Sequence, residues 1–242
     1  MCIRDRYIET MTLKNCLYKT SHNKVTKQDY LFVFLASIIS ACGFALNSET
    51  VVIGSMLISP VLKPLINLAI SLLRGQYSTL YLSLLHLVGM IVLVILIGGS
   101  LAYLFYQVFP TLRTTFNNAL QEEDNPEASA EAKTILGRVG SLIQTDKGLP
   151  TTGFWFIVLI AIAGGVLLAR THCTDDADIT TAIIGTGIST SVLPPIIAGA
   201  MLFAMGSEHS IPKFMNGLSL SMINILAIFV SYMATLYLSR DT

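Results

Sequence analysis

Two apolar stretches carry the residues whose types and spacing could do chemistry, and proline interrupts both. Residues 47–73 open on a polar Asn-Ser-Glu-Thr run and are predicted to be cut by Gly54, Pro60 and Pro64. Residues 179–204 carry a run of small hydroxyl residues ahead of Pro194 and Pro195. Proline removes a backbone donor and clashes with the preceding turn, which frees polar groups that hydrocarbon cannot satisfy. The freed half-helix ends carry partial charges that suit an ion or a charged substrate.

We therefore predict a substrate or ion pathway at these two interruptions. Its candidate residues are Asn47, Ser48, Glu49, Gly54, Ser59, Pro60, Lys63, Pro64, Gly185, Thr186, Gly187, Ser189, Thr190, Ser191, Pro194 and Pro195, together with Asn224 near the end of the chain. The alternative for the glycine, serine and threonine residues is that they let helices pack closely and hydrogen-bond across the contact.

Single polar residues within the apolar stretches have competing interpretations. Lys63 lies mid-segment, where a charge costs at least about 2.5–3.5 kcal/mol on insertion scales. Its position predicts that the ammonium group contacts an anion or pairs with Glu49 or another acid. The alternative is that the long aliphatic stem snorkels and carries the charge to the surface. Glu49, with Ser48, is interpreted as a helix cap, and His86 as a packing residue. Interhelical hydrogen bonding is the expected role of three asparagines: Asn47, Asn67 and Asn224.

No catalytic or metal motif is present in the sequence. A nucleophile–base arrangement, a phosphate loop and a zinc-hydrolase signature are all missing, so we expect no enzyme, no catalytic residue and no cofactor. His172 and Cys173 precede three aspartates, but a short loop without repeated ligand spacing predicts a solvated turn and no metal site. The four cysteines are scattered, which supports neither zinc nor a disulfide framework.

The composition is that of a protein embedded in a lipid bilayer. Hydrophobic residues make up 53% and charged residues 12% of the chain, with a mean hydropathy of +0.67, whereas soluble domains carry about 25% charged residues. A net charge of zero argues against a nucleic-acid partner. Six stretches approach the roughly 20 residues that a bilayer core requires. They cover residues 30–46, 51–73, 80–109, 153–169, 179–204 and 214–238.

These spans divide the chain into four parts. Residues 1–29 form a polar, basic cytoplasmic tail, 30–109 the first three spans, 110–152 an extracytoplasmic hydrophilic connector, and 153–242 the last three spans. If the tail is cytoplasmic, Arg74, Arg170 and Arg240 also fall inside, in agreement with the positive-inside bias. Both termini are therefore predicted to be cytoplasmic.

The two interrupted stretches also align with each other. Pairing Pro64 with Pro195 gives eight identical pairs over residues 53–75 and 184–206. Three spans in each half is an odd number, so the second half must enter the membrane from the opposite side. The predicted fold is an all-α integral membrane protein with six transmembrane helices in two inverted three-span repeats, whose second and fifth spans are broken. Inverted repeats with broken helices near the midplane recur in secondary transporters.

The chain resembles the bacterial and archaeal membrane family known as domain of unknown function 389. The resemblance covers about residues 31–238 and rests on two motifs. The first runs from Asn47-Ser48 through Val51-Val52-Ile53-Gly54-Ser55-Met56-Leu57-Ile58-Ser59-Pro60, with Pro64 following; the second is Val192-Leu193-Pro194-Pro195, with Asn224 in the last span. The resemblance implies a multi-pass protein of the prokaryotic cytoplasmic (inner) membrane. It leaves the activity open.

Two functions follow from these observations. The first is a transporter or channel for a small solute or ion, with a midplane site at the two broken helices. The alternative is a non-transporting membrane scaffold or sensor, in which the broken helices serve packing only. A pathway predicts polar groups converging on a hydrated cavity, and a scaffold predicts a dry, tightly packed junction. Both a monomer and a homo-oligomer remain open.

Overall fold

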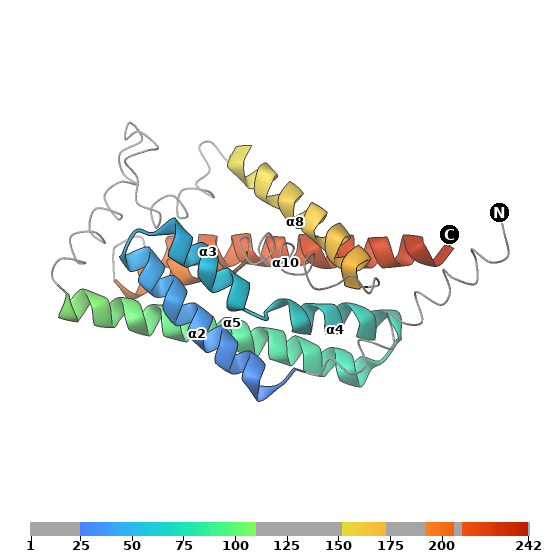
Figure 1. The fold of residues 1–242 in the computed structure, drawn as a ribbon, viewed down its shortest axis with the longest axis horizontal. Coiled ribbons are helices and arrows are strands. Elements are labelled where there is room, and N and C mark those ends of the chain that lie inside the picture. The colour runs from blue at the N-terminus through green and yellow to red at the C-terminus, as the bar shows by residue number, and fades with distance from the viewer. Residues whose placement is uncertain (1–24, 110–151, 173–191, 206–209, 242) are drawn as a thin grey trace.

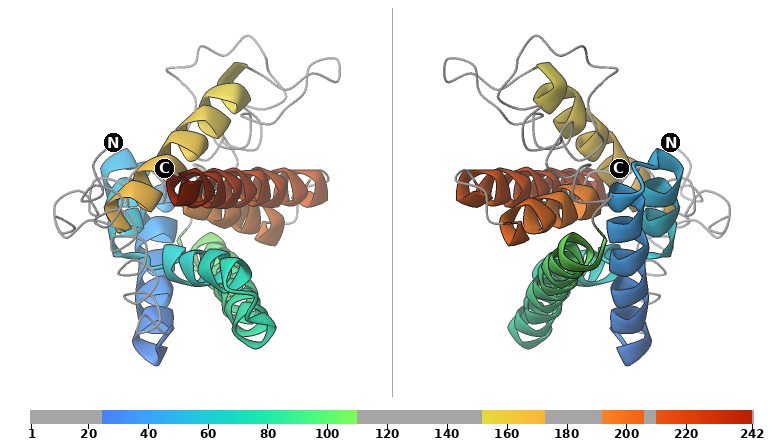
Figure 2. Two further views of the ribbon diagram at one scale, coloured as in Figure 1. Left: turned by 90° about the vertical axis from the view of Figure 1, so that its right-hand side faces the viewer. Right: turned by 90° about the vertical axis from the view of Figure 1, so that its left-hand side faces the viewer.

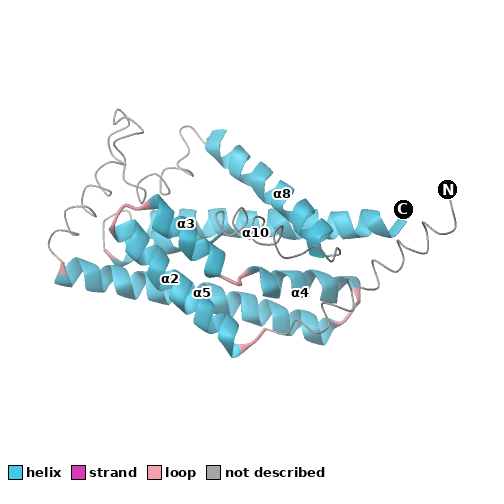
Figure 3. Cartoon of the chain, in the orientation of Figure 1, coloured by secondary structure: helices cyan, strands magenta, loops and turns pink. Residues whose placement is uncertain are grey.

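The computed structural model describes residues 25–109, 152–172, 192–205 and 210–241. Within these ranges every regular element is a helix, and no strand occurs (Figure 3). The predicted connector at 110–152 and the predicted polar tail fall almost wholly outside the described residues. So do the candidates Gly185, Thr186, Gly187, Ser189, Thr190 and Ser191.

Four helices follow one another between residues 25 and 109 (Figure 1). They are α2 (Lys27–Ala45), α3 (Glu49–Ile58), α4 (Leu62–Leu73) and α5 (Tyr77–Val108). Thr26 and Asp29 form a reciprocal capping box at the start of α2, which satisfies two backbone donors that a helix start leaves free. After α4, Gly75 adopts a φ of 66°, and Gln76 N–H bonds to Ser71 O at 3.0 Å. This left-handed turn ends α4 and starts the long helix α5.

The second half repeats part of this order. It contains α8 (Thr152–His172), a short helix Val192–Ala204, and α10 (Ser210–Asp241). An apolar helix segment is thus followed by a helix of 32 residues in both halves, α4 by α5 and Val192–Ala204 by α10. Pro64 and Pro195, which the sequence alignment pairs, both lie in these apolar segments.

Helices α2 and α3 form a close antiparallel hairpin (Figures 1 and 2). A Cβ atom on Gly43 would lie 2.9 Å from the backbone nitrogen of Val52, so only glycine allows the two backbones to approach this closely. Helix α4 continues from α3 and packs along α5, while α8 crosses α10 on the other side of the molecule.

The Val192–Ala204 helix is the most deeply buried element among the described residues. Every side chain from Val192 to Leu202 is buried. One side faces α5, where a Cβ on Gly98 would lie 3.5 Å from Ala200. The opposite side meets α10 through Gly199 and Gly217, whose Cα atoms lie close together. A helix that is apolar all round lies in a protein core or in a membrane, and here α5 and α10 contribute to the cover.

Among the described residues, three helices are long and apolar enough to cross a membrane, within Lys27–Ala45, Tyr77–Val108 and Phe214–Leu238. The pair α3 and α4, bent by 44°, passes the same test as one broken span or as a re-entrant loop. Large apolar side chains also face outward, including Leu96 and Leu226, which are 64% and 61% exposed. These features are consistent with a membrane protein whose outer surface is covered by lipid.

The first interruption is narrower than the sequence predicts. Ser59, Pro60 and Val61 separate α3 from α4. Gly54 lies inside α3 and Pro64 in the first turn of α4, so the prediction that these two residues also cut the helix is wrong. Proline is tolerated in a first turn because the backbone N–H groups there have no intrahelical acceptor. Pro194 and Pro195 lie within the described helix segment Val192–Ala204.

Candidate functional site

The break between α3 and α4 brings two helix ends together inside an apolar segment. Ser59 N–H bonds to Met56 O at 3.4 Å, and Lys63 N–H bonds to Pro60 O at 3.1 Å. Each helix end leaves up to four backbone groups without an intrahelical partner. The carbonyl groups that end α3 and the N–H groups that start α4 therefore lie at the same point of the chain. A polar ligand there has both hydrogen-bond acceptors and hydrogen-bond donors as partners.

Ser59 places a hydroxyl at this break. The residue is 8% exposed, and its Oγ has no hydrogen-bond partner among the described residues. Ser55, one turn earlier in α3, donates instead to Val52 O at 2.6 Å. Buried polar side chains are nearly always hydrogen-bonded, so an unsatisfied one requires an explanation. A solute or ordered water at the break would supply the missing partner.

Lys63 forms an ion pair with a residue that the sequence interpretation did not select. Its Nζ lies 2.7 Å from Oδ1 of Asp29, which belongs to the first turn of α2. The predicted acidic partner is confirmed, but it is Asp29 and not Glu49. Asp29 is 2% exposed, while the Lys63 side chain is 39% exposed. The Thr-x-x-Asp pattern at residues 26–29 is a capping-box signature. It is the sequence feature that places Asp29 at the start of a helix.

The polar run at residues 47–49 forms the turn between α2 and α3. Asn47 has a φ of 51°; its N–H bonds to Phe44 O at 3.2 Å, and Ser48 N–H bonds to Gly43 O at 2.9 Å. This pair of bonds is a Schellman motif, which needs a left-handed residue at the position of Asn47. Ser48 is the N-cap of α3 as predicted, but its side chain makes no capping hydrogen bond. Glu49 lies in the first turn of α3, as expected.

Substitutions of Asn47 distinguish its role in the turn from a role in the pathway. We expect Asn47→Val to lower the free energy of unfolding by about 1–2 kcal/mol, because a β-branched residue is strained at positive φ. Asn47→Gly is expected to keep the stability within about 0.5 kcal/mol, because glycine adopts this conformation freely. Thermal unfolding in detergent measures both variants. If Asn47→Gly were as stable as the parent chain but lost solute flux, Asn47 would act beyond the turn.

The Val192–Ala204 helix is hydrogen-bonded to α10 by a serine hydroxyl. Ser221 Oγ donates to Val192 O at 2.9 Å and also lies 3.0 Å from Gly217 O. Asn224 follows three residues later and is 0% exposed, so it continues the face of α10 that carries Gly217 and Ser221. The interhelical role expected for Asn224 stays a prediction. The sequence interpretation missed Ser221.

His86 is the packing residue that the sequence predicts. Its Nδ1 lies 2.9 Å from the hydroxyl of Tyr30 on α2, and the two rings meet edge to face. Gly89, one turn further along α5, leaves space for the Tyr30 hydroxyl. The described residues contain no group of three or more His, Cys, Asp and Glu side chains placed to bind a metal.

Comparison with known proteins identifies the family. The family model described as "Domain of unknown function (DUF389)" matches residues 56–230, which includes the break, Lys63 and Asn224. The chain belongs to this family. The chain is also similar to the uncharacterized protein MJ0678 of Methanocaldococcus jannaschii, with 24% identity over 208 residues. The match covers 86% of this chain and 52% of MJ0678, so the chain spans about half the length of that relative. No solved structure matches.

Proposed function

We propose that this DUF389 protein is a transporter or channel for a small solute or ion, with its pathway at the α3–α4 break and at the start of the Val192–Ala204 helix. One observation carries the proposal: a segment that passes as one broken membrane span has a buried, unsatisfied hydroxyl, Ser59 Oγ, at its bend. In hydrocarbon, non-helical backbone is tolerated only where it is buried in protein or lines a water-filled cavity.

The repeated order of helices supports a second site related to the first. In each half, an apolar helix segment that contains proline precedes a helix of 32 residues. We infer six spans in two inverted repeats, with both termini cytoplasmic in a prokaryotic inner membrane. Transporters of this build bind solutes between discontinuous helices near the midplane. The role we propose is not enzymatic, and it needs no nucleic acid.

A specific observation favours the alternative of a membrane scaffold or sensor. The Val192–Ala204 helix is packed against α5 and α10 through glycines, and its residues from Val192 to Leu202 are buried. The narrow gap between α4, α8 and α10 is apolar and has no room for water; Leu65, Leu168 and Tyr232 are among its lining residues. A dry junction of this kind is what a scaffold requires.

A flux survey in proteoliposomes tests the proposal. The panel covers protons, small anions, monovalent cations and small metabolites, and it compares the intact chain with Ser59→Ala. We expect at least one solute class to cross, with about tenfold lower flux in Ser59→Ala, because one hydrogen bond to a solute contributes about 0.5–1.5 kcal/mol. Thr186→Val/Ser189→Ala/Thr190→Val, chosen from the sequence, tests the second interruption in the same way.

Ser37→Ala is the matched control. Ser37 is a buried serine on α2 whose hydroxyl already donates to Val33 O at 2.7 Å, so its loss should leave flux unchanged. Absence of flux across the whole panel would favour the scaffold. Equal flux in Ser59→Ala and in the intact chain would remove Ser59 from the pathway.

A further inference from the structure

The ammonium group of Lys63 has binding capacity that the fold does not use. A lysine side chain offers three hydrogen-bond donors. One of them reaches Asp29 Oδ1 at 2.7 Å, and the described residues supply no other partner. With 39% of its side chain exposed, Lys63 lies at the edge of the α3–α4 break and is open to an incoming group.

The carboxylate of Asp29, in contrast, has further partners on its own helix. Its Oδ2 accepts hydrogen bonds from the backbone N–H of Thr26 at 2.8 Å and from the Thr26 hydroxyl at 3.0 Å. Asp29 also lies in the first turn of α2, where the helix dipole favours negative charge. If Lys63 moved to another anion, Asp29 would keep these partners. Asp29 can therefore act as a resident counter-ion.

The surroundings of Lys63 favour a negatively charged ligand. The first turn of α4 contains Lys63 and no acidic residue, and a helix start carries a partial positive charge. Ser59, just before α4, adds a hydroxyl donor without a partner. The described charged or titratable groups at this junction are Asp29 and Tyr30 on α2, Lys63 on α4 and His86 on α5, and Tyr30 and His86 are bonded to each other.

We propose that Lys63 is an anion-binding residue that exchanges Asp29 for an oxygen anion of the phosphate, sulfate or carboxylate type. This inference rests on the proposed function in so far as it names the solute class of that pathway. The same chemistry is offered by a soluble oxyanion and by the phosphate of an anionic phospholipid headgroup. The two sources differ in whether the bound anion is a solute or part of the bilayer.

Binding measurements on the purified full chain test the inference without requiring transport. Inorganic phosphate and sulfate are titrated by calorimetry in neutral detergent at constant ionic strength, because screening weakens exposed charge pairs. We expect saturable binding, about tenfold tighter binding in Asp29→Asn, and loss of binding in Lys63→Gln. Removing the competing carboxylate adds one charge-assisted interaction for the ligand, and tenfold corresponds to the lower end of that effect.

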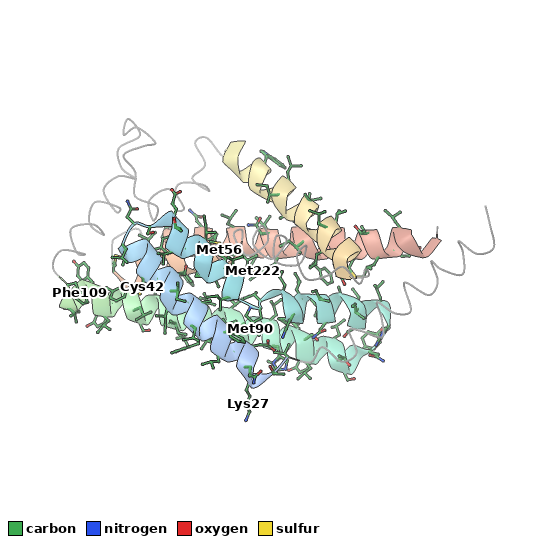
Figure 4. The ribbon with its side chains drawn as sticks, viewed as in Figure 1. Lys27, Cys42, Met56, Met90, Phe109 and Met222 are labelled. Carbon is green, nitrogen blue, oxygen red and sulfur yellow. The ribbon has the colours of Figure 1, made fainter. Side chains whose placement is uncertain are left out.

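Two further variants keep the test interpretable. Lys63→Arg should retain binding because it keeps the positive charge. Lys27→Gln should change nothing, because Lys27 is exposed and projects away from the helices (Figure 4). A gain of affinity in Asp29→Asn cannot arise from misfolding. Unchanged affinity in both Asp29→Asn and Lys63→Gln would overturn the inference, as would absence of any anion binding in both arms of the experiment.

The second arm identifies the source of the anion. Native mass spectrometry compares phospholipid retained from nanodiscs of neutral and of anionic composition, for the intact chain and Lys63→Gln. Lysine-dependent retention of anionic lipid without binding of phosphate or sulfate would support a headgroup as the ligand. Lysine-dependent binding of phosphate would support a solute. Flux that persists in Lys63→Gln without any anion binding would contradict this inference alone, while binding without flux would contradict only the transport proposal.

Discussion

Gly217→Ala is expected to lower the free energy of unfolding by about 3 kcal/mol, the upper part of the range for overpacked cores. The added Cβ would overlap the backbone carbonyl oxygen of Pro195 and lie 3.4 Å from the Cα of Gly199. A backbone carbonyl cannot rotate away as a side chain can, so α10 and the Val192–Ala204 helix would have to separate. Their separation would also lengthen the hydrogen bond from Ser221 to Val192 O.

Thermal unfolding followed by tryptophan fluorescence measures this effect, because the single tryptophan of the chain, Trp155, lies on α8, which packs against α10. Gly54→Ala is the matched control. No atom lies within 4 Å of a Cβ built on Gly54, and alanine is favoured over glycine in a helix by up to about 1 kcal/mol. The same chemical change should thus stabilise the chain at α3 and destabilise it at α10. A Gly217→Ala variant as stable as the parent would contradict the close helix contact.

Lys63→Met is expected to lower the free energy of unfolding by about 2 kcal/mol. Removing one partner of a buried ion pair typically costs 3–5 kcal/mol, and the exposure of the Lys63 side chain reduces this amount. The effect arises because Asp29, at 2% exposure, would remain charged without a cation. Thr26 would compensate only in part, through its two hydrogen bonds to Oδ2.

A double-mutant cycle isolates this pair from other effects of the substitutions. Asp29→Asn keeps an acceptor for Thr26 and removes the charge, so Asp29→Asn/Lys63→Met should be more stable than Lys63→Met alone. We expect a coupling energy of about 1–2 kcal/mol, within the range for contacting residues. Chemical unfolding in mixed micelles measures the four proteins. Additive effects of the two substitutions would show that the 2.7 Å contact makes no net contribution to stability.

The sequence predicts the helices well where the apolar runs are long. The predicted span 214–238 lies within α10, and 80–109 differs from α5 by only a few residues at each end. Short helices are harder to delimit, because proline both interrupts a helix and favours its first turn. Pro60 lies in the break, whereas Pro64 lies inside α4. The choice between these two roles depends on backbone geometry that residue types alone do not determine.

The partners of the site residues were predicted less completely. The sequence indicates that Lys63 needs an anion, but Asp29 lies 34 residues earlier, beside the boundary expected between tail and first span. Helix α2 begins at Lys27, so this acid becomes part of the helix and reaches α4. The polarity of Asn47 predicts a place in the pathway. The structure shows that its positive φ gives it a role in the turn between α2 and α3. Such assignments require knowledge of tertiary contacts.

The burial of the Val192–Ala204 helix also constrains the order in which the chain can be assembled. One of its covering helices, α5, is synthesised before it, and the other, α10, after it. A nascent chain that ends before α10 therefore has this helix with its Gly199 face uncovered. Docking of α10 must cover this helix after translation has passed Gly217. Helix α10 thus closes the centre of the described molecule, and loss of α10 would affect the interior before the periphery.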